Sequence, residues 1–378
     1  MTVDFPEPRA VYVHVPFCAH RCGYCDFTLV AGRDDLVDRY LAALEVELQS
    51  LGTRRPIETL FFGGGTPTHL SMSALSRLMD LLQRWFELSA DGEFSVEANP
   101  AGLGTDKIHL LADAGVNRVS LGAQSFDTGV LRRLERDHRS ADILRAIERL
   151  RMRIDNVSLD LIFAAPGQSL DLWNETLDAA LAAAPQHIST YGLTFEKGTA
   201  FWSRLRKGTL RKAPEELERA MYAAAMDRLA TAGYRQYEIS NFAQPGFECR
   251  HNLVYWKGHP YYGFGPGAAR YLAGRRETNH RSVTSWLKRI ETGGSPIADS
   301  ERLFDEDRAR EQFVLGLRMT AGVETAEFRR QTGFDIDRLA GETISRYRHL
   351  GLLEQTDVHI RLTREGRFVA DTIVGDFL

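Results

Sequence analysis

The chain has 378 residues, 43% of them hydrophobic and 26% charged, with a formal net charge of −4. This composition is typical of a soluble globular protein and argues against a disordered chain. The lack of a basic excess argues against a dedicated nucleic-acid binder. The sequence contains neither an apolar stretch of about 18 residues nor a signal-peptide pattern, so we expect a cytoplasmic protein, with peripheral contact at the inner membrane face left open.

Short apolar strands alternate with amphipathic helices through the first half of the chain. The expected strands are residues 10–15, 59–62, 94–98, 118–121, 157–163 and 187–194. The expected helices between them are residues 35–50, 71–86, 106–114, segments up to 149, and 170–183. Such alternation predicts parallel strands joined by right-handed crossovers. Six units fall short of the eight that close a full barrel, so the pattern favours an α/β fold with an incomplete (β/α)6 barrel over an open doubly wound sheet.

The second half of the chain has a different pattern. It predicts a helix at 215–232, a strand at 237–239 and an irregular segment at 261–267. Three helices and two short strands follow, at 304–319, 325–331, 336–350, 351–354 and 359–363. We therefore expect a core barrel in 1–240, an extension in 241–299 and a C-terminal helical, winged-helix-like domain in 300–378. Winged helices often bind DNA, but no basic helix dominates here and we expect no nucleic-acid partner.

Three cysteines lie within eight residues after the first strand, as Cys18-x3-Cys22-x2-Cys25, and Cys249 is the only other one. In a reducing cytoplasm such a cluster more often binds metal than forms disulfides. A structural zinc ion normally takes four protein ligands. A 4Fe-4S cluster can be held by three thiolates, which leaves one iron open to a small ligand. A three-cysteine zinc site and unconnected buried thiols remain alternatives.

Polar and glycine-rich residues recur where the expected strands end. Residues 63–68 follow the second strand, Glu97 closes the third, Gln124 follows the fourth and Asp160 lies within the fifth. The carboxyl ends of barrel strands meet at one face, so we expect these residues to line one site with the cysteines. Glycine without a side chain lets a ligand approach the main chain closely, although a plain turn is the common meaning of such a run.

Two charged residues have both a functional and an ordinary interpretation. Glu97 lies on an otherwise apolar strand, where a carboxylate is costly unless it is paired or bound to a ligand. Arg136 could bind a carboxylate in bidentate fashion. A structural salt bridge would explain Glu97 equally well, and surface pairing with Glu135 or Asp137 would explain Arg136.

The cysteine spacing resembles that of radical S-adenosylmethionine (SAM) enzymes. Together with Tyr12 and residues 63–68, 95–100, 121–126, 160–163 and 166–168, it resembles the oxygen-independent coproporphyrinogen III oxidase-like family over nearly the whole chain. The resemblance implies that Cys18, Cys22 and Cys25 ligate a 4Fe-4S cluster whose open iron binds SAM. The SAM pocket that it implies consists of Tyr12, Tyr24, Gly64, Gly65, Thr66, Glu97, Gln124, Arg136 and Asp160.

Within this family the sequence departs from the true oxidase. The oxidase has a fourth cysteine where this chain has Phe27, and a longer segment before the cluster. Residues 251–256, His-Asn-Leu-Val-Tyr-Trp, instead resemble the H-N-x-x-Y-W pattern of the HemW-type heme chaperone branch. An imidazole can ligate heme iron, and aromatic rings offer flat faces to a porphyrin. The resemblance thus implies heme binding by His251, Tyr255 and Trp256. The Cys249 thiolate, two residues before His251, is an alternative ligand.

The resemblance implies a heme chaperone rather than a coproporphyrinogen oxidase. Such a protein binds heme and a SAM-ligated 4Fe-4S cluster and passes heme to acceptor apoproteins, with respiratory enzymes at the membrane as candidates. Two alternatives stay open. One is an oxygen-independent coproporphyrinogen III oxidase of porphyrin biosynthesis, and the other is a DNA-binding regulator with a redox-sensing cluster.

Overall fold

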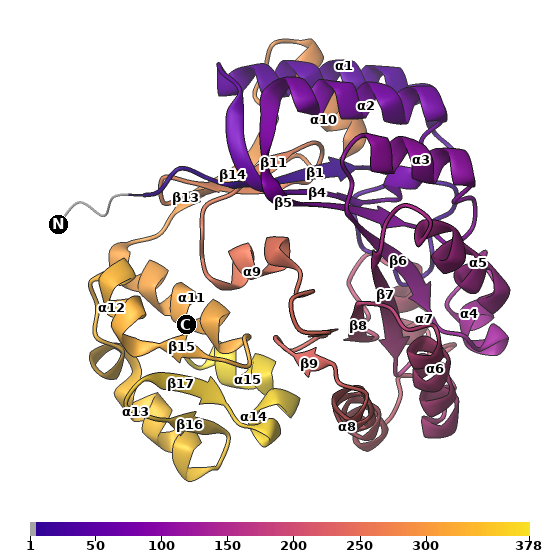
Figure 1. The fold of residues 1–378 in the computed structure, drawn as a ribbon. Coiled ribbons are helices and arrows are strands. Elements are labelled where there is room, and N and C mark those ends of the chain that lie inside the picture. Colours follow the sequence, from indigo (N-terminus) through magenta and orange to yellow (C-terminus); the bar gives the residue numbers. More distant parts are fainter. Residues whose placement is uncertain (1–4) are drawn as a thin grey trace.

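The computed structural model describes residues 5–378 and has one curved nine-stranded sheet at its centre (Figure 1). Six strands run parallel and lie side by side in chain order, which confirms the predicted six-unit barrel. They are β1 (Ala10–Val15), β4 (Arg55–Gly64), β5 (Phe86–Ala98), β6 (Arg118–Gln124), β7 (Asn156–Phe163) and β8 (His187–Gly192). The two edge strands of the sheet, β11 (Tyr262–Phe264) and β9 (Arg235–Gln236), do not pair with each other, so the barrel is incomplete.

Helices cover the outer face of this sheet (Figure 1). They are α1 (Val37–Leu48), α2 (Met72–Trp85), α3 (Thr105–Asp113), α4 (Thr128–Arg133), α5 (Ser140–Leu150), α6 (Leu170–Ala182), α7 (Ala200–Arg206) and α8 (Glu215–Thr231). The sequence sets their starts: the Ser71 hydroxyl accepts from the Ala74 amide at the start of α2, and Ser169 caps α6 in the same way. Among residues 5–378, no helix is both long and apolar enough to cross a membrane.

Residues 235–243 form a hairpin at one edge of the sheet. The strand expected at 237–239 is wrong: β9 (Arg235–Gln236) and β10 (Asn241–Ala243) lie on either side of it, and β10 pairs antiparallel with β8. Glu238 closes the turn between them, because its carboxylate accepts from the Ser240 amide and the Asn241 side chain. A side chain bonded to its own turn favours a turn over a strand.

The opposite edge carries a seventh parallel strand. β11 (Tyr262–Phe264) pairs with β1, so the expectation of an irregular segment at 261–267 is wrong. Glycine weakens a strand pattern, and it usually marks a close backbone approach. A Cβ on Gly263 would lie 1.8 Å from the carbonyl oxygen of Ala269, which explains the glycine at this position.

The rest of the extension packs beside the barrel. It contains α9 (Arg250–Trp256), α10 (Val283–Glu291) and a sheet of β12 (Ala269–Leu272), β13 (Arg275–Asn279) and β14 (Ile297–Arg302). Trp286 of α10 lies against Tyr40 of α1, with ring centroids 5.8 Å apart, and both side chains are buried in the barrel core. The sequence did not indicate this small sheet. Its last strand runs across the division expected at residue 300, and that division remains a proposal.

The C-terminal part has its own hydrophobic core and the predicted winged-helix-like form. Its elements are α11 (Asp305–Leu317), β15 (Val323–Glu324), α12 (Thr325–Thr332), α13 (Ile336–His349), β16 (Leu353–Gln355), β17 (His359–Leu362), α14 (Arg364–Phe368) and α15 (Ala370–Gly375). Phe313, Phe328, Ile344, Ile360 and Phe377 are buried together in this core. Figure 1 shows this part, in orange and yellow, facing the side of the barrel where α9 lies.

Candidate functional site

A cavity of about 680 Å³ opens at the carboxyl ends of the parallel strands. It brings together nearly all of the residues that the sequence singled out for the cluster and SAM. Those that line it are Cys18, Cys22, Tyr24, Cys25, Gly64, Gly65, Thr66, Glu97, Gln124, Arg136 and Asp160. Tyr191 and Gly192 at the end of β8 also line it, so strand ends from six β/α units build one site, as the barrel geometry predicts.

Tyr12 is the one predicted SAM residue that does not line this cavity. Its hydroxyl lies 3.0 Å from His14 Nδ1, and its ring stacks on Phe61 at 6.1 Å. It lies deeper in the barrel, and a direct contact with SAM remains a prediction.

The cysteine loop is closed by its own hydrogen bonds. It runs between two short strands, β2 (Phe17–Cys18) and β3 (Val30–Ala31). The Cys25 amide donates to the Cys22 carbonyl at 3.1 Å. The Arg21 guanidinium donates to the carbonyls of Cys25 and Leu29, at 3.2 and 2.7 Å. These bonds stabilise the loop, and all three of its cysteines line the cavity.

Two of the thiols have polar neighbours. Cys18 Sγ lies 3.2 Å from the Thr66 hydroxyl, and Arg136 Nη1 donates to Cys22 Sγ at 3.5 Å. Burial raises the pKa of Cys18 to about 11 and also raises that of Cys25. Bound iron would reverse this, because coordination holds a thiol deprotonated.

The cysteines do not surround one common point. Among residues 5–378, no three side chains of His, Cys, Asp or Glu are grouped so as to hold a single metal ion. A 4Fe-4S cluster takes one thiolate on each of three irons, so its ligands need not converge. The donor set and the adjacent cavity fit such a cluster.

Gly64 and Gly65 line the cavity, and neither position has room for a side chain. Gly64 has φ of +111°, and a Cβ there would lie 2.4 Å from the His14 ring. A Cβ on Gly65 would lie 2.7 Å from the Phe17 carbonyl oxygen. The Gly64 amide donates to Glu97 Oε2 at 3.0 Å. Here glycine is required by backbone conformation and by close approach, not only by a turn.

Two carboxylates lie in the cavity. Burial, and secondly the charge of Asp160, raise the pKa of Glu97 to about 7. Burial also raises the pKa of Asp160, whose two oxygens both lie 3.0 Å from the Ser120 hydroxyl. Among residues 5–378, Glu97 forms no ion pair within 4.0 Å and its carboxylate accepts from the Gly64 amide instead, so the alternative of a structural salt bridge is wrong. The pair suits a ligand with a cationic or hydroxyl group.

Glutamine at position 97 is expected to change how stability depends on pH. The folded-state pKa of Glu97, about 7, is above its usual 4.5, so its contribution to stability is complete below about pH 4.5 and is lost as the pH rises through 7. The unfolding free energy of metal-free wild type, minus that of Glu97→Gln, should therefore fall between pH 5 and 8. Urea unfolding at three pH values measures it. If the difference in unfolding free energy stays constant between pH 5 and 8, the raised pKa of Glu97 is contradicted.

Arg136 is half-buried and forms no ion pair among the described residues. Its Nη2 donates to the Gly122 carbonyl at 2.9 Å, and its Nε has no hydrogen-bond partner among the described residues. Glu135 pairs instead with Arg204, and Asp137 accepts from Asn99. The surface-pairing interpretation of Arg136 is therefore wrong. An unsatisfied buried guanidinium nitrogen suits an anionic ligand group.

Gln124 lies in a strained part of the backbone. Its φ is +62°, and the register between β6 and β7 shifts just before it. A left-handed conformation in a residue other than glycine costs energy and is concentrated at functional sites.

The His251 motif forms α9, which lies against the interior of the barrel. His251 is 1% exposed and its ring stacks on Phe61, with centroids 5.1 Å apart. Its Nδ1 lies 2.8 Å from the Thr59 hydroxyl, and its Nε2 lies 2.8 Å from the Tyr255 hydroxyl. Burial lowers the pKa of His251 to about 3, so the imidazole is neutral. Both of its nitrogens are engaged in this structure.

The other aromatic ring of the motif faces the C-terminal part. The Arg318 guanidinium lies over the Trp256 ring at 4.6 Å and 3.7 Å from the Glu238 carboxylate. Trp256 Nε1 is buried and has no partner among the described residues. Cys249, at the start of α9, is fully buried, and burial raises its pKa to about 12, which disfavours the thiolate that a ligand would need.

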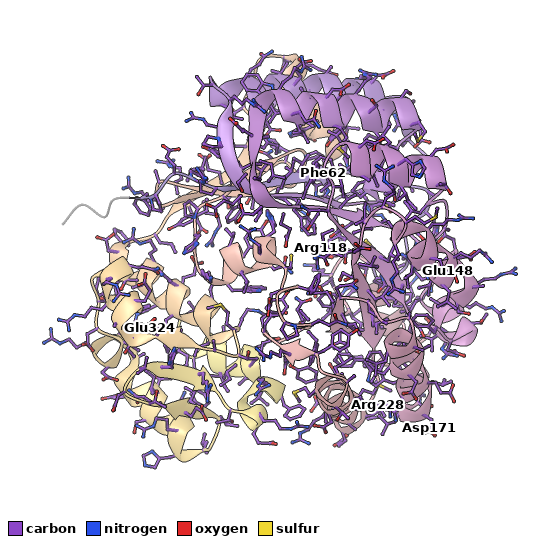
Figure 2. The ribbon with its side chains drawn as sticks, viewed as in Figure 1. Phe62, Arg118, Glu148, Asp171, Arg228 and Glu324 are labelled. Carbon is purple, nitrogen blue, oxygen red and sulfur yellow. The ribbon has the colours of Figure 1, made fainter. Side chains whose placement is uncertain are left out.

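Glu93 is a functional candidate that the sequence reading missed. Its carboxylate accepts from the amides of Arg250 and His251 at 2.9 and 3.2 Å, and from the Cys249 thiol at 3.5 Å. Arg118 lies beside it in the barrel interior, and Figure 2 shows Arg118 on the side of the sheet where α9 lies. Glu93 precedes Glu97 by four residues on β5, so period-two alternation could have placed both on the inner face.

Comparison with known proteins gives matches over the whole chain. A model of the radical SAM superfamily matches residues 12–180, and one of the HemN C-terminal domain matches residues 303–369. The heme chaperone HemW of Bacillus subtilis is 39% identical over 98% of this chain and 99% of its own length. The Bos taurus mitochondrial radical S-adenosyl methionine domain-containing protein 1 is 33% identical over 97% and 87%. The structure of Escherichia coli coproporphyrinogen III oxidase (HemN) matches with a TM-score of 0.86 at 23% identity, covering 98% of this chain and 90% of that one.

Proposed function

Because the chain belongs to the HemW family of radical SAM proteins, we propose that it is a heme chaperone that binds heme and a SAM-ligated 4Fe-4S cluster and delivers heme to acceptor apoproteins. The main support is the placement of α9, whose His251 shares the barrel interior with the carboxylates of the cysteine-lined cavity. Acceptors at the membrane, such as respiratory enzymes, and a cytoplasmic location are part of the proposal.

Cys18, Cys22 and Cys25 would ligate the cluster. When bound, the cluster and SAM supply one-electron chemistry at the sulfonium. The Arg136 guanidinium, with its unpartnered nitrogen, would bind the SAM carboxylate. The main chain at Gly64, Gly65 and Thr66 would approach the amino acid part of SAM.

Other residues would position the nucleoside part of SAM. Glu97 and Asp160 offer carboxylates to hydroxyl or ammonium groups, and Tyr24 and Gln124 line the same cavity. Tyr12 lies deeper in the barrel and would support the site through stacked rings. Its ring stacks on Phe61, and Phe61 stacks on His251.

Heme binding requires α9 to open. His251 can donate a nitrogen lone pair to iron only after its Nε2 gives up the Tyr255 hydroxyl. A porphyrin can stack on the face of Trp256 that Arg318 covers only after that guanidinium moves away. We propose that this structure is the closed form and that heme binds an open one.

Alanine at position 251 is expected to lower heme affinity at least tenfold, because a neutral imidazole ligand is lost. Titration of the reconstituted protein with heme, followed by the Soret band, measures this. His259→Ala is the matched control, since His259 is exposed and lies just beyond α9. Equal heme binding by wild type and His251→Ala would remove His251 from the site.

Conversion of coproporphyrinogen is not part of the proposed function. Phe27 occupies the position of the oxidase's fourth cysteine, and it is 57% exposed next to the cluster loop. Anaerobic incubation with SAM, reductant and coproporphyrinogen should give no vinyl product. Turnover to protoporphyrinogen would overturn the chaperone proposal in favour of the oxidase.

A further inference from the structure

We propose that the cleft between the barrel edge and the C-terminal part is a binding site for a small dianion, a phosphate or a dicarboxylate. The cleft has a volume of about 750 Å³ and lies between α8 and β9 on one side and β17 and α14 on the other. None of its lining residues belongs to the cysteine-lined cavity or to the His251 motif.

Four guanidinium groups and a single carboxylate line this cleft. They belong to Arg235, Arg361, Arg364, Arg367 and Glu354. Two of the arginines are neutralised: Arg361 pairs with Glu354, and Arg364 makes a bidentate contact with Asp227 at 2.7 and 2.9 Å. Within the described part of the chain, neither Arg235 nor Arg367 forms an ion pair. The cleft therefore keeps two positive charges.

Arg367 is the group that most needs a ligand. Its Nη1 donates to the neutral amide oxygen of Gln236 at 2.6 Å, and its buried Nε has no hydrogen-bond partner in residues 5–378. Burial, together with the charges of Arg364 and Arg361, lowers the pKa of Arg367. An unsatisfied buried donor is costly, and an anionic oxygen at this point would satisfy it.

Packing of the C-terminal part against the barrel does not explain this excess of positive charge. At the same junction, Arg219 pairs with Glu365 at 2.7 Å, so the ordinary contact here joins one arginine to one carboxylate. If Arg367 served only to hold the two parts together, we would expect it to pair with a carboxylate, as Arg219 does.

The guanidinium fork indicates the chemistry of the ligand. Arginine binds phosphate and carboxylate oxygens through two parallel N–H bonds, and two unpaired arginines match two negative charges. Arg235 lies on the barrel edge and Arg367 on α14, so a bound dianion would bridge the barrel and the C-terminal part.

The test measures binding of inorganic phosphate and, separately, of succinate to the full chain by calorimetry at constant ionic strength. We expect saturable binding of at least one of them, weakened at least tenfold in Arg367→Gln and in Arg235→Gln. Arg153→Gln is the control for loss of one positive charge, since Arg153 pairs with Asp113 elsewhere on the surface. The Arg153→Gln variant should bind phosphate and succinate as tightly as wild type does.

The two ligands separate the two sources of the anion. Binding of phosphate alone identifies a phosphorylated ligand, and binding of succinate alone identifies a dicarboxylate. Arg367→Lys, which keeps the charge but loses the fork, should bind more weakly than wild type and should retain the wild-type circular dichroism spectrum. Absence of saturable binding of both anions, or equal binding by Arg367→Gln, overturns the proposal. Neither ligand contains iron or a porphyrin, so the result is independent of heme binding at His251.

Discussion

Alanine at position 22 is expected to abolish assembly of the iron–sulfur cluster. Anaerobically reconstituted wild type should contain about four irons per chain, and Cys22→Ala should contain fewer than about one, because two thiolates do not hold a cubane. Cys22 is also the thiol that accepts from Arg136, so no neighbouring cysteine can replace it without moving that guanidinium. Iron and sulfide analysis, with the visible absorbance of the cluster, measures the effect.

Cys249→Ala is the matched control for this variant. Cys249 is the fourth cysteine of the chain, fully buried at the start of α9 and bonded to Glu93, and it does not line the cavity of the other three. The Cys249→Ala variant should keep the iron content of wild type. Wild type that carries no iron and holds a tight zinc ion instead would overturn the cluster assignment, and an iron-free Cys249→Ala would shift it toward a different ligand set.

Alanine at position 93 is expected to destabilise the barrel by about 3 kcal/mol, because it leaves buried donors unsatisfied. The amides of Arg250 and His251 lose their acceptor, and the buried Arg118 guanidinium loses a neighbouring charge. Urea unfolding measures the loss. Heme affinity should rise at the same time, because the loss of the Glu93 contacts favours the open form of α9 that binds heme.

Two further substitutions sharpen this prediction. Glu87→Ala removes an exposed carboxylate from the same strand and should change stability by less than about 0.5 kcal/mol. Glu93→Gln keeps one acceptor oxygen and should lie between the alanine variant and wild type. An alanine variant as stable as wild type, with unchanged heme affinity, would show that Glu93 does not position α9.

Stability and heme transfer are linked through α9 in this proposal. The helix has only seven residues, which is too short to be stable in isolation. It is held by Glu93 at its start, by Thr59 and Phe61 along the His251 ring, and by Arg318 over Trp256. Such a helix can leave the barrel when heme offers a better ligand contact.

Local sequence patterns were sufficient to predict the barrel and the cysteine-lined site. The alternation of strands and helices predicts parallel pairing, and parallel strands place their carboxyl ends at one edge. Cys18, Gly64, Glu97 and Gln124 lie at or just after a strand end and Asp160 lies in the second half of β7, so local patterns were sufficient to bring them together.

The contacts made by the second half of the chain could not be predicted from local patterns. Thr59 and His251 are separated by 192 positions and Glu93 and Arg250 by 157, and no local pattern predicts contacts across such distances. The same holds for β11, which pairs with β1 although the two strands lie far apart in the sequence. It also holds for the cleft that Arg235 and Arg367 line together. Strand ends converge because of regular backbone geometry, whereas these contacts depend on how separate segments pack, and packing is resolved only when the whole chain folds.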